Sequence, residues 1–271
     1  METPEPSATP TFPAAAAVTP PRGPWGFWAT LGFGLLAMLA MVAAQALVGV
    51  VFGIVHAVQS HQQQRGAVDG EEIARQLAAD PVMLSFALFT SVPVVLLTLL
   101  GFVALRRGPR IRDYLGLRGF RFRQFLLWLI VLVAAVFAGD WFLRGQNDVS
   151  AAKFMTDLIS SGRFLPLLFV AVVFGAPVVE EFIFRGFMYR GMLQPGRPPI
   201  AAILVPNCLW VLLHLQYSWP TLTALFAVGA VLGLARHFSG STWLAVFLHL
   251  INNAAAFWTA SSLGSEAAPP V

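Results

Sequence analysis

The sequence predicts an all-helical bundle that crosses a membrane about seven times. Of the 271 residues, 57% are hydrophobic and only 11% are charged, whereas about 25% are charged in soluble domains. The mean hydropathy is +0.72. This composition excludes a typical soluble domain, a disordered protein and a disulfide-stapled secreted domain, and it leaves an integral membrane protein.

The apolar segments follow a short tail. Residues 1–23 are rich in Pro and Ala with few large apolar side chains, so we expect them to be disordered. Seven apolar segments come next, at 25–55, 82–105, 125–142, 165–189, 200–217, 220–238 and 243–259. A spanning helix needs roughly 20 residues. The first segment is longer, so it is tilted, kinked or extended past the lipid, or it is split, which would make eight spans.

The distribution of arginine predicts the orientation in the membrane. The loop 106–123 carries seven Arg and one Asp, whereas the loop 59–81 has two Arg against two Glu and two Asp. Because short cytoplasmic loops are enriched in Lys and Arg, the loop 106–123 lies inside. Alternation then puts the N-terminus, Arg190 and Arg236 on the cytoplasmic side and the C-terminus outside. The same clusters account for the pI near 10.0, so we expect contact with membrane lipid and none with nucleic acid.

Three charged residues interrupt the fourth segment. Glu180, Glu181 and Arg185 lie within it, and each charge at a helix centre costs roughly 2.5–3.5 kcal/mol on insertion scales. Glu181 and Arg185 are four apart in the favourable order for a helical ion pair. Glu180 lies about 100° away around the helix and is a candidate general base. Pro177 is expected to kink this helix.

Two later segments each carry a polar pair on one helical face. Trp210 and His214 are four residues apart in the fifth segment, and His249 and Asn253 in the seventh. We measured the depth of each side chain in the membrane from the midpoint of its segment, at about 1.5 Å per residue. The depths of these side chains and of Glu180 then spread over roughly 12 Å. His214 fits least well, so we expect the fifth segment to begin deeper than drawn or the helices to cross steeply.

Other interpretations of these polar residues have to be weighed. A lone His in a membrane helix is often only a hydrogen-bond partner of a neighbouring helix. A catalytically silent scaffold or immunity factor would be expected to lack the central Glu or His. Buried Glu and His also form proton relays in transporters, but the sequence shows no internal repeat of the kind transporters carry. An enzyme site therefore explains the three clusters together best.

The three runs together resemble the signature of the CPBP intramembrane proteases (CAAX proteases and bacteriocin-processing enzymes, also called the Abi family). That signature has EExxxR on one transmembrane helix, [F/W]xxxH on the next and HxxxN/D on a later one. This sequence has EEFIFR at 180–185, WVLLH at 210–214 and HLINN at 249–253, in that order. The resembling region is residues 165–259.

The resemblance implies an intramembrane endopeptidase that acts on a membrane-associated or lipidated protein or peptide, as in CAAX processing or in bacteriocin processing and immunity. It implies a core at 164–260 after N-terminal transmembrane helices at 24–163, with a C-terminal tail at 261–271, in a plasma membrane, bacterial by its composition. Glu180 would be the catalytic carboxylate with His214 as its partner in activating water. Neutral His249 and the amide of Asn253 would stabilise the oxyanion. Supporting roles would fall to Glu181, Arg185 and Trp210.

The resemblance leaves the metal question open. Two His and one Glu could ligate zinc with a fourth position for water, and the ligands would then be Glu180, His214 and His249. The sequence has no HExxH run, which places two His and a base on one helix face. The type II CAAX enzymes, which the chain resembles, look instead like metal-independent glutamate proteases. The resemblance therefore favours a metal-free glutamate mechanism, and both alternatives need the same residues.

Overall fold

The computed structural model describes residues 23–62, 70–160, 163–196 and 198–266, which form helices and connecting turns with no β-strand among them. The expected tail at 1–23 lies outside the described residues except for its last position. The expected tail at 261–271 is helical as far as it is described, because the last helix continues to Glu266.

Six helices are long and apolar enough to cross a membrane, which confirms the predicted polytopic bundle. They are α1 (Phe27–Gln62), α3 (Pro81–Leu105), α5 (Phe122–Gly145), the composite helix from α7 to α9 (Leu165–Met192), α11 (Trp219–Ser239) and α12 (Thr242–Glu266). The remaining predicted segment forms a shorter apolar helix, α10 (Ile200–Leu212). All seven predicted segments are thus helical, and α1 is one continuous helix rather than two.

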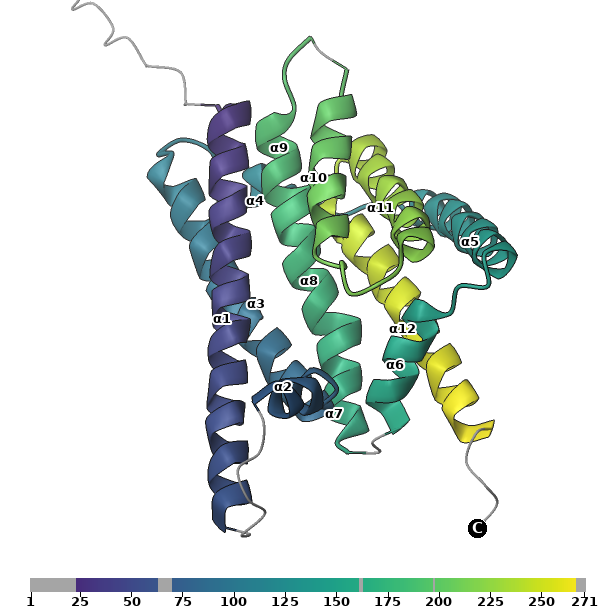
Figure 1. Cartoon of the computed structure of the whole chain (residues 1–271). Coiled ribbons are helices and arrows are strands. Elements are labelled where there is room, and N and C mark those ends of the chain that lie inside the picture. The colour runs from purple at the N-terminus through teal and green to yellow at the C-terminus, as the bar shows by residue number, and fades with distance from the viewer. Residues whose placement is uncertain (1–22, 63–69, 161–162, 197, 267–271) are drawn as a thin grey trace, which may run out of the picture.

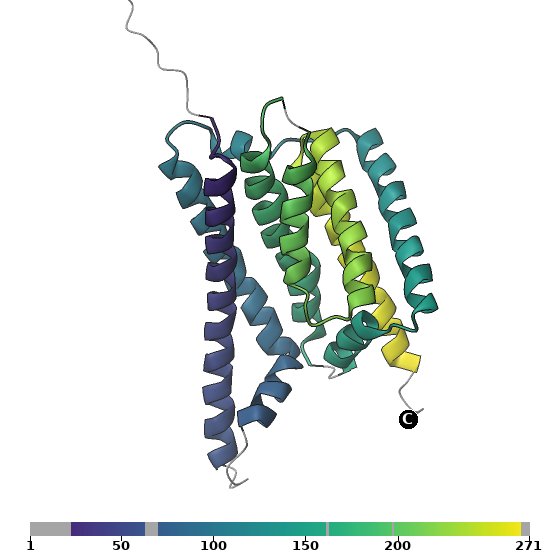
Figure 2. The same ribbon diagram turned by 45° about the horizontal axis from the view of Figure 1, so that its top comes forward.

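The basic connections gather at one end of the bundle. Figures 1 and 2 show α4 (Ile111–Tyr114), the α9–α10 connection and the α11–α12 connection at the end where α1 begins. The short helices α2 (Gly70–Ala78) and α6 (Ser150–Ser160) lie at the opposite end. Successive connections therefore lie at alternate ends of the bundle, in the order that the loop charges predicted.

The composite helix is the centre of the fold. In its most apolar window 67% of the residues are buried, whereas in α5 the share is 6%. It stands between α1 and α3 on one side and α10 to α12 on the other (Figure 1). Close approach depends on small residues: a Cβ at Gly191 would overlap the hydroxyl of Thr30 on α1.

Two π-helical turns interrupt the composite helix. They are η1 (Ala171–Gly175) and η2 (Phe182–Met188), and α8 (Ala176–Glu181) lies between them. The N–H of Ala176 donates to the carbonyl of Ala171, five residues back. The next bond in this pattern would join residue 177 to Val172, but Pro177 has no N–H. The predicted distortion at this proline is therefore a π-helical turn that leaves the carbonyl of Val172 without a backbone donor from residue 177. Such turns are frequent at functional sites.

A polar cap outside the spans fixes the start of α11. Asp148, between α5 and α6, accepts hydrogen bonds from the backbone N–H of Thr221 (3.1 Å), from its hydroxyl (2.8 Å) and from Ser218. Burial acts to raise the pKa of Asp148, but the bonds from Ser218, Ser150 and Thr221 outweigh it, and the pKa falls from 3.8 to about 2. The carboxylate therefore stabilises this end of the bundle in its ionised form.

Candidate active site

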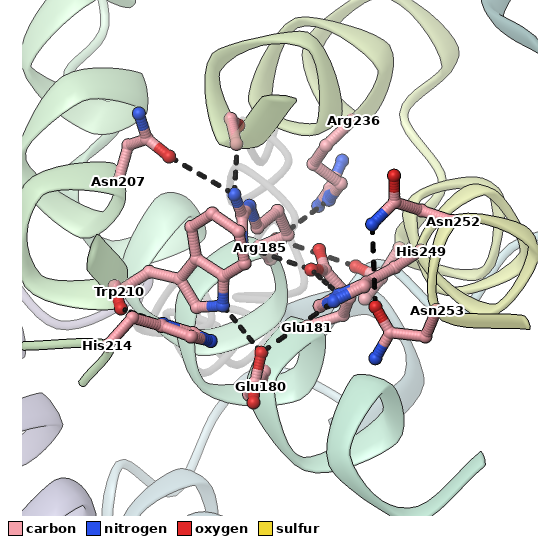
Figure 3. Close-up of polar contacts among 12 residues, drawn as sticks. Glu180, Glu181, Arg185, Asn207, Trp210, His214, Arg236, His249, Asn252 and Asn253 are labelled. Carbon is pink, nitrogen blue, oxygen red and sulfur yellow. Dashed lines mark hydrogen bonds and ion pairs between the residues drawn. The ribbon is translucent and has the colours of Figure 1, made fainter. Parts of the chain in front are cut away.

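The structure brings the seven predicted site residues into one region at the centre of the bundle (Figure 3). They come from three helical regions that are separate in sequence. The first region, α8 and η2, supplies Glu180, Glu181 and Arg185; α10 and the turn after it supply Trp210 and His214; and α12 supplies His249 and Asn253.

Glu181 and Arg185 form the ion pair that their spacing predicted. Arg185 Nη1 lies 3.0 Å from Glu181 Oε1, and their side chains are 3% and 0% exposed. The same oxygen lies 2.9 Å from His249 Nδ1. A carboxylate bound to arginine accepts hydrogen bonds only, so Nδ1 of His249 carries its hydrogen. The other oxygen, Glu181 Oε2, is buried with no hydrogen-bond partner among the described residues.

Glu180 is held by one of its two carboxylate oxygens. The indole N–H of Trp210 donates to Oε2 over 2.5 Å, and His249 Nε2 lies 3.8 Å from the same oxygen. Among the described residues none donates a hydrogen bond to Oε1, and the side chain is 15% exposed. Glu180 therefore has a fixed orientation and one oxygen free to bind a water molecule.

His214 lies beside this carboxylate without touching it. Its Nδ1 donates to the carbonyl of Trp210 over 3.0 Å. Since a carbonyl only accepts, Nδ1 carries a hydrogen, and a neutral ring then has its lone pair on Nε2. Tyr217 stacks on the imidazole at 6.0 Å between ring centres. In the described part of the chain, His214 makes no direct hydrogen bond to Glu180, although Figure 3 shows its ring extending toward that side chain.

The poor depth fit expected for His214 has a structural reason. The helix α10 ends at Leu212, earlier than the sequence suggested, and His214 lies in the following turn. A short helix that ends inside the bundle brings this side chain to the level of α8.

Asn253 supplies the donor that Pro177 lacks. Its Nδ2 donates to the carbonyl of Val172 over 3.0 Å, which is the carbonyl left free by the π-helical turn η1. One amide N–H of Asn253 is thus committed to the backbone, and the second remains for another acceptor. The residue ties α12 to the composite helix at the level of the site.

The residues that surround Arg185 were not predicted to belong to the site. Arg185 Nη2 donates to Asn207 Oδ1 at 3.3 Å and to the carbonyl of Gly229 at 2.8 Å. The guanidinium of Arg236 donates to the carbonyl of Arg185 at 2.9 Å. The sequence assigned Arg236 only to the cytoplasmic side of the membrane, whereas the structure buries it to 5% exposure. Asn207 had a visible signal, because it is polar within an apolar helix and lies three residues before Trp210.

The zinc alternative stays open. The described His, Cys, Asp and Glu side chains include no group of three already placed to hold a metal ion. Nδ1 of each site histidine is nevertheless bonded to a protein acceptor, as in histidines that bind a metal through Nε2, and Glu180 uses only Oε2 in its bond to Trp210. Glu180, His214 and His249 would be the ligands of such an ion, and the chemical steps below use the side chains of this chain alone.

About a third of the chain matches a known protein family. Residues 162–255 match the family described as Rce1-like, type II CAAX prenyl endopeptidase, and this segment includes all seven site residues. The chain is also 32% identical over 134 residues to an "Uncharacterized 24.3 kDa protein" of Escherichia coli, with 45% of this chain and 58% of that protein covered. No solved structure matches the chain. The family match at residues 162–255 confirms the predicted resemblance to the CPBP proteases for that part of the chain.

Proposed function

We propose that this integral membrane protein is an intramembrane endopeptidase, because residues 162–255 match the Rce1-like, type II CAAX prenyl endopeptidase family. The observation that carries the proposal is the state of Glu180. One of its oxygens is fixed by Trp210, the other is open, and two histidines stand beside it. A positioned carboxylate of this kind can take a proton from water as the water attacks a peptide carbonyl.

The proposed reaction uses a water molecule between Glu180 and His214. The two side chains are not directly bonded, and Nε2 of His214 has a free lone pair, so a water can bridge Nε2 and Glu180 Oε1. Glu180 removes one proton from this water while the oxygen of the water bonds to the carbonyl carbon of the peptide. The same proton passes to the departing amine nitrogen when the peptide bond breaks, which restores the carboxylate.

We propose His249 as the first donor to the oxyanion. Its Nδ1–H is bonded to Glu181, so Nε2 is the nitrogen that faces Glu180, at 3.8 Å, and the reacting atoms. A ring with its hydrogen on Nδ1 alone has none on Nε2, so His249 acts as the donor in the form that carries a hydrogen on Nε2. The remaining N–H of Asn253 is the second proposed donor to the oxyanion.

The substrate class follows from the surroundings of the site. The apolar bundle excludes bulk water and suits a peptide chain carried by a membrane anchor, such as a prenylated protein or a hydrophobic peptide. In this proposal residues 164–260 form the catalytic core, and the N-terminal helices at 24–163 pack around it. The arginine-rich end, with the N-terminus, faces the cytoplasm, and the membrane is the plasma membrane, bacterial by the composition of the chain.

Membrane terminomics would test this function. Cells would express the wild type, Glu180→Gln or Glu72→Gln, where Glu72 is an exposed partner of Arg75 on α2 and serves as the control. New peptide ends should appear with the wild type and the control and vanish with Glu180→Gln. Ends that persist in Glu180→Gln would refute the role of Glu180. The absence of any wild-type-dependent ends, with normal physiology in the variant, would favour a scaffold.

A further inference from the structure

The guanidinium of Arg185 is held from two sides. Nη1 faces Glu181, and Nη2 faces Asn207 and the carbonyl of Gly229. The group also lies over the ring of Trp210, 5.0 Å from its centre. A guanidinium is a planar, rigid fork, so fixing Nη2 also fixes the direction in which Nη1 points.

Asn207 has a defined orientation. Its Oδ1 accepts from Arg185, and its Nδ2 donates to the carbonyl of Phe226 on α11 over 2.9 Å. A guanidinium only donates and a carbonyl only accepts, so the two ends of the amide cannot be exchanged. With 1% exposure, Asn207 is a fixed polar bridge among α10, α11 and the composite helix.

Gly229 allows this bridge to form. A Cβ at this position would overlap both Asn207 Oδ1 and the ring of Trp210. Because there is no side chain, the backbone of α11 comes close enough for its carbonyl to reach Arg185. Any larger residue would push away the two groups that hold Arg185 and Glu180.

The contacts continue from this bridge to the proposed reaction centre. Arg185 and His249 meet on the same oxygen, Glu181 Oε1, at 3.0 and 2.9 Å. His249 Nε2 then lies 3.8 Å from Glu180. A displacement of Arg185 would move Glu181, and with it the hydrogen bond that sets the plane of the His249 ring.

We propose that Asn207 and the Gly229 carbonyl form a positioning site that orients Arg185 and, through Glu181, aims His249 at the reacting atoms. The proposal rests on the proposed endopeptidase function. Neither group touches the substrate; both act through Arg185. The bridge consists of a single amide in α10 and a single backbone carbonyl in α11, so it can be removed one contact at a time.

The kinetic test uses Asn207→Leu, which keeps the volume and removes the acceptor. With purified full-length protein and an internally quenched, farnesylated CAAX peptide as the probe, kcat should fall on the order of tenfold to hundredfold, as expected for a misplaced catalytic group, while KM stays within about twofold. In an Arg185→Met background, Asn207→Leu should cause no further loss. Unchanged kcat, or equal losses in both backgrounds, would overturn the proposal. If Asn207→Leu does not fold, Asn207→Ser serves in its place. The serine side chain is too short to reach Arg185, so the same loss of kcat is expected.

A spectroscopic test is independent of turnover. In full-length protein labelled with ¹⁵N-histidine, the Nδ1–H signal of His249, identified by its loss in His249→Gln, should shift or disappear in Asn207→Leu. It should be unchanged in Ser91→Ala, which removes a polar contact between α1 and α3 that involves none of the site residues. An unaltered His249 signal in Asn207→Leu would refute the positioning role. A shifted signal in a protein that cleaves no probe would support the positioning site and count against the proposed function.

Discussion

Removing Arg185 should destabilise the protein far more than removing an exposed cation with the same spacing. In Arg185→Met, the fully buried Glu181 loses its arginine and keeps only His249 on Oε1, and its Oε2 has no partner among the described residues. Breaking a buried pair by deleting one partner costs about 3–5 kcal/mol. The upper part of that range is expected, because Asn207 and Gly229 also lose their donor.

Lys153→Met provides the matched control. Lys153 and Asp157 are also four apart and 2.9 Å from each other, but their side chains are 69% and 53% exposed. Loss of such a pair costs about 0–1 kcal/mol. Thermal unfolding in detergent micelles and the yield of monodisperse protein would measure both variants.

A double variant separates stranded charge from lost packing. Glu181→Gln with Arg185→Met removes both charges and keeps an amide oxygen to accept from His249 Nδ1. Most of the stability lost in Arg185→Met should return, since replacing both partners of a buried pair is often neutral. The reasoning is refuted if Arg185→Met unfolds at the wild-type temperature, or if the double variant is no more stable than the single one.

Three further predictions follow from individual contacts. Trp210→Phe removes the indole N–H that holds the general base and should lower kcat by about tenfold, the equivalent of 1.4 kcal/mol; unchanged steady-state kinetics would contradict this. Asn253→Leu strands the carbonyl of Val172 and should cost about 1–3 kcal/mol of stability, whereas Asn252→Leu, whose contact is 3.5 Å long, should cost less in the same unfolding assay. Asp148→Asn should lower the unfolding temperature at pH 7. The pKa of Asp148 is depressed to about 2, so the carboxylate stabilises the fold fully above its usual pKa of 3.8, and this stabilisation is lost as the pH falls through 2. The difference in unfolding temperature between the wild type and Asp148→Asn should therefore narrow between about pH 4 and pH 2. A difference that stays constant would refute the ionised cap.

Much of the fold and the site was predictable because lipid makes polar residues conspicuous. Charges within apolar segments are costly, so Glu180, Glu181 and Arg185 stand out in the sequence by residue type alone. Helical spacing then fixed which residues share a face, as the Glu181–Arg185 pair shows. The seven helical segments followed from hydropathy alone.

The features that were missed depend on contacts distant in sequence. The π-helical turn before Pro177 needs a donor from Asn253 on α12, which spacing along one helix cannot reveal. The partner carbonyl of Gly229 is a backbone group and is invisible in residue type. Arg236 lies near a helix end and indicated only the cytoplasmic side in the sequence. In the structure the residues that follow α4 pack against it, and a Cβ at Gly116 would overlap its guanidinium.

The most direct test of Glu180 as the water-activating base is a rate comparison in reconstituted membranes. Wild type and Glu180→Gln, purified and placed in the same liposomes, would be given the peptide identified by terminomics, and cleavage would be followed by mass spectrometry. The amide introduced by Glu180→Gln can still accept from Trp210 but cannot take a proton from water, so the rate should fall by about 10²–10⁴. A Glu180→Gln protein that cleaves within about tenfold of the wild-type rate would contradict the account.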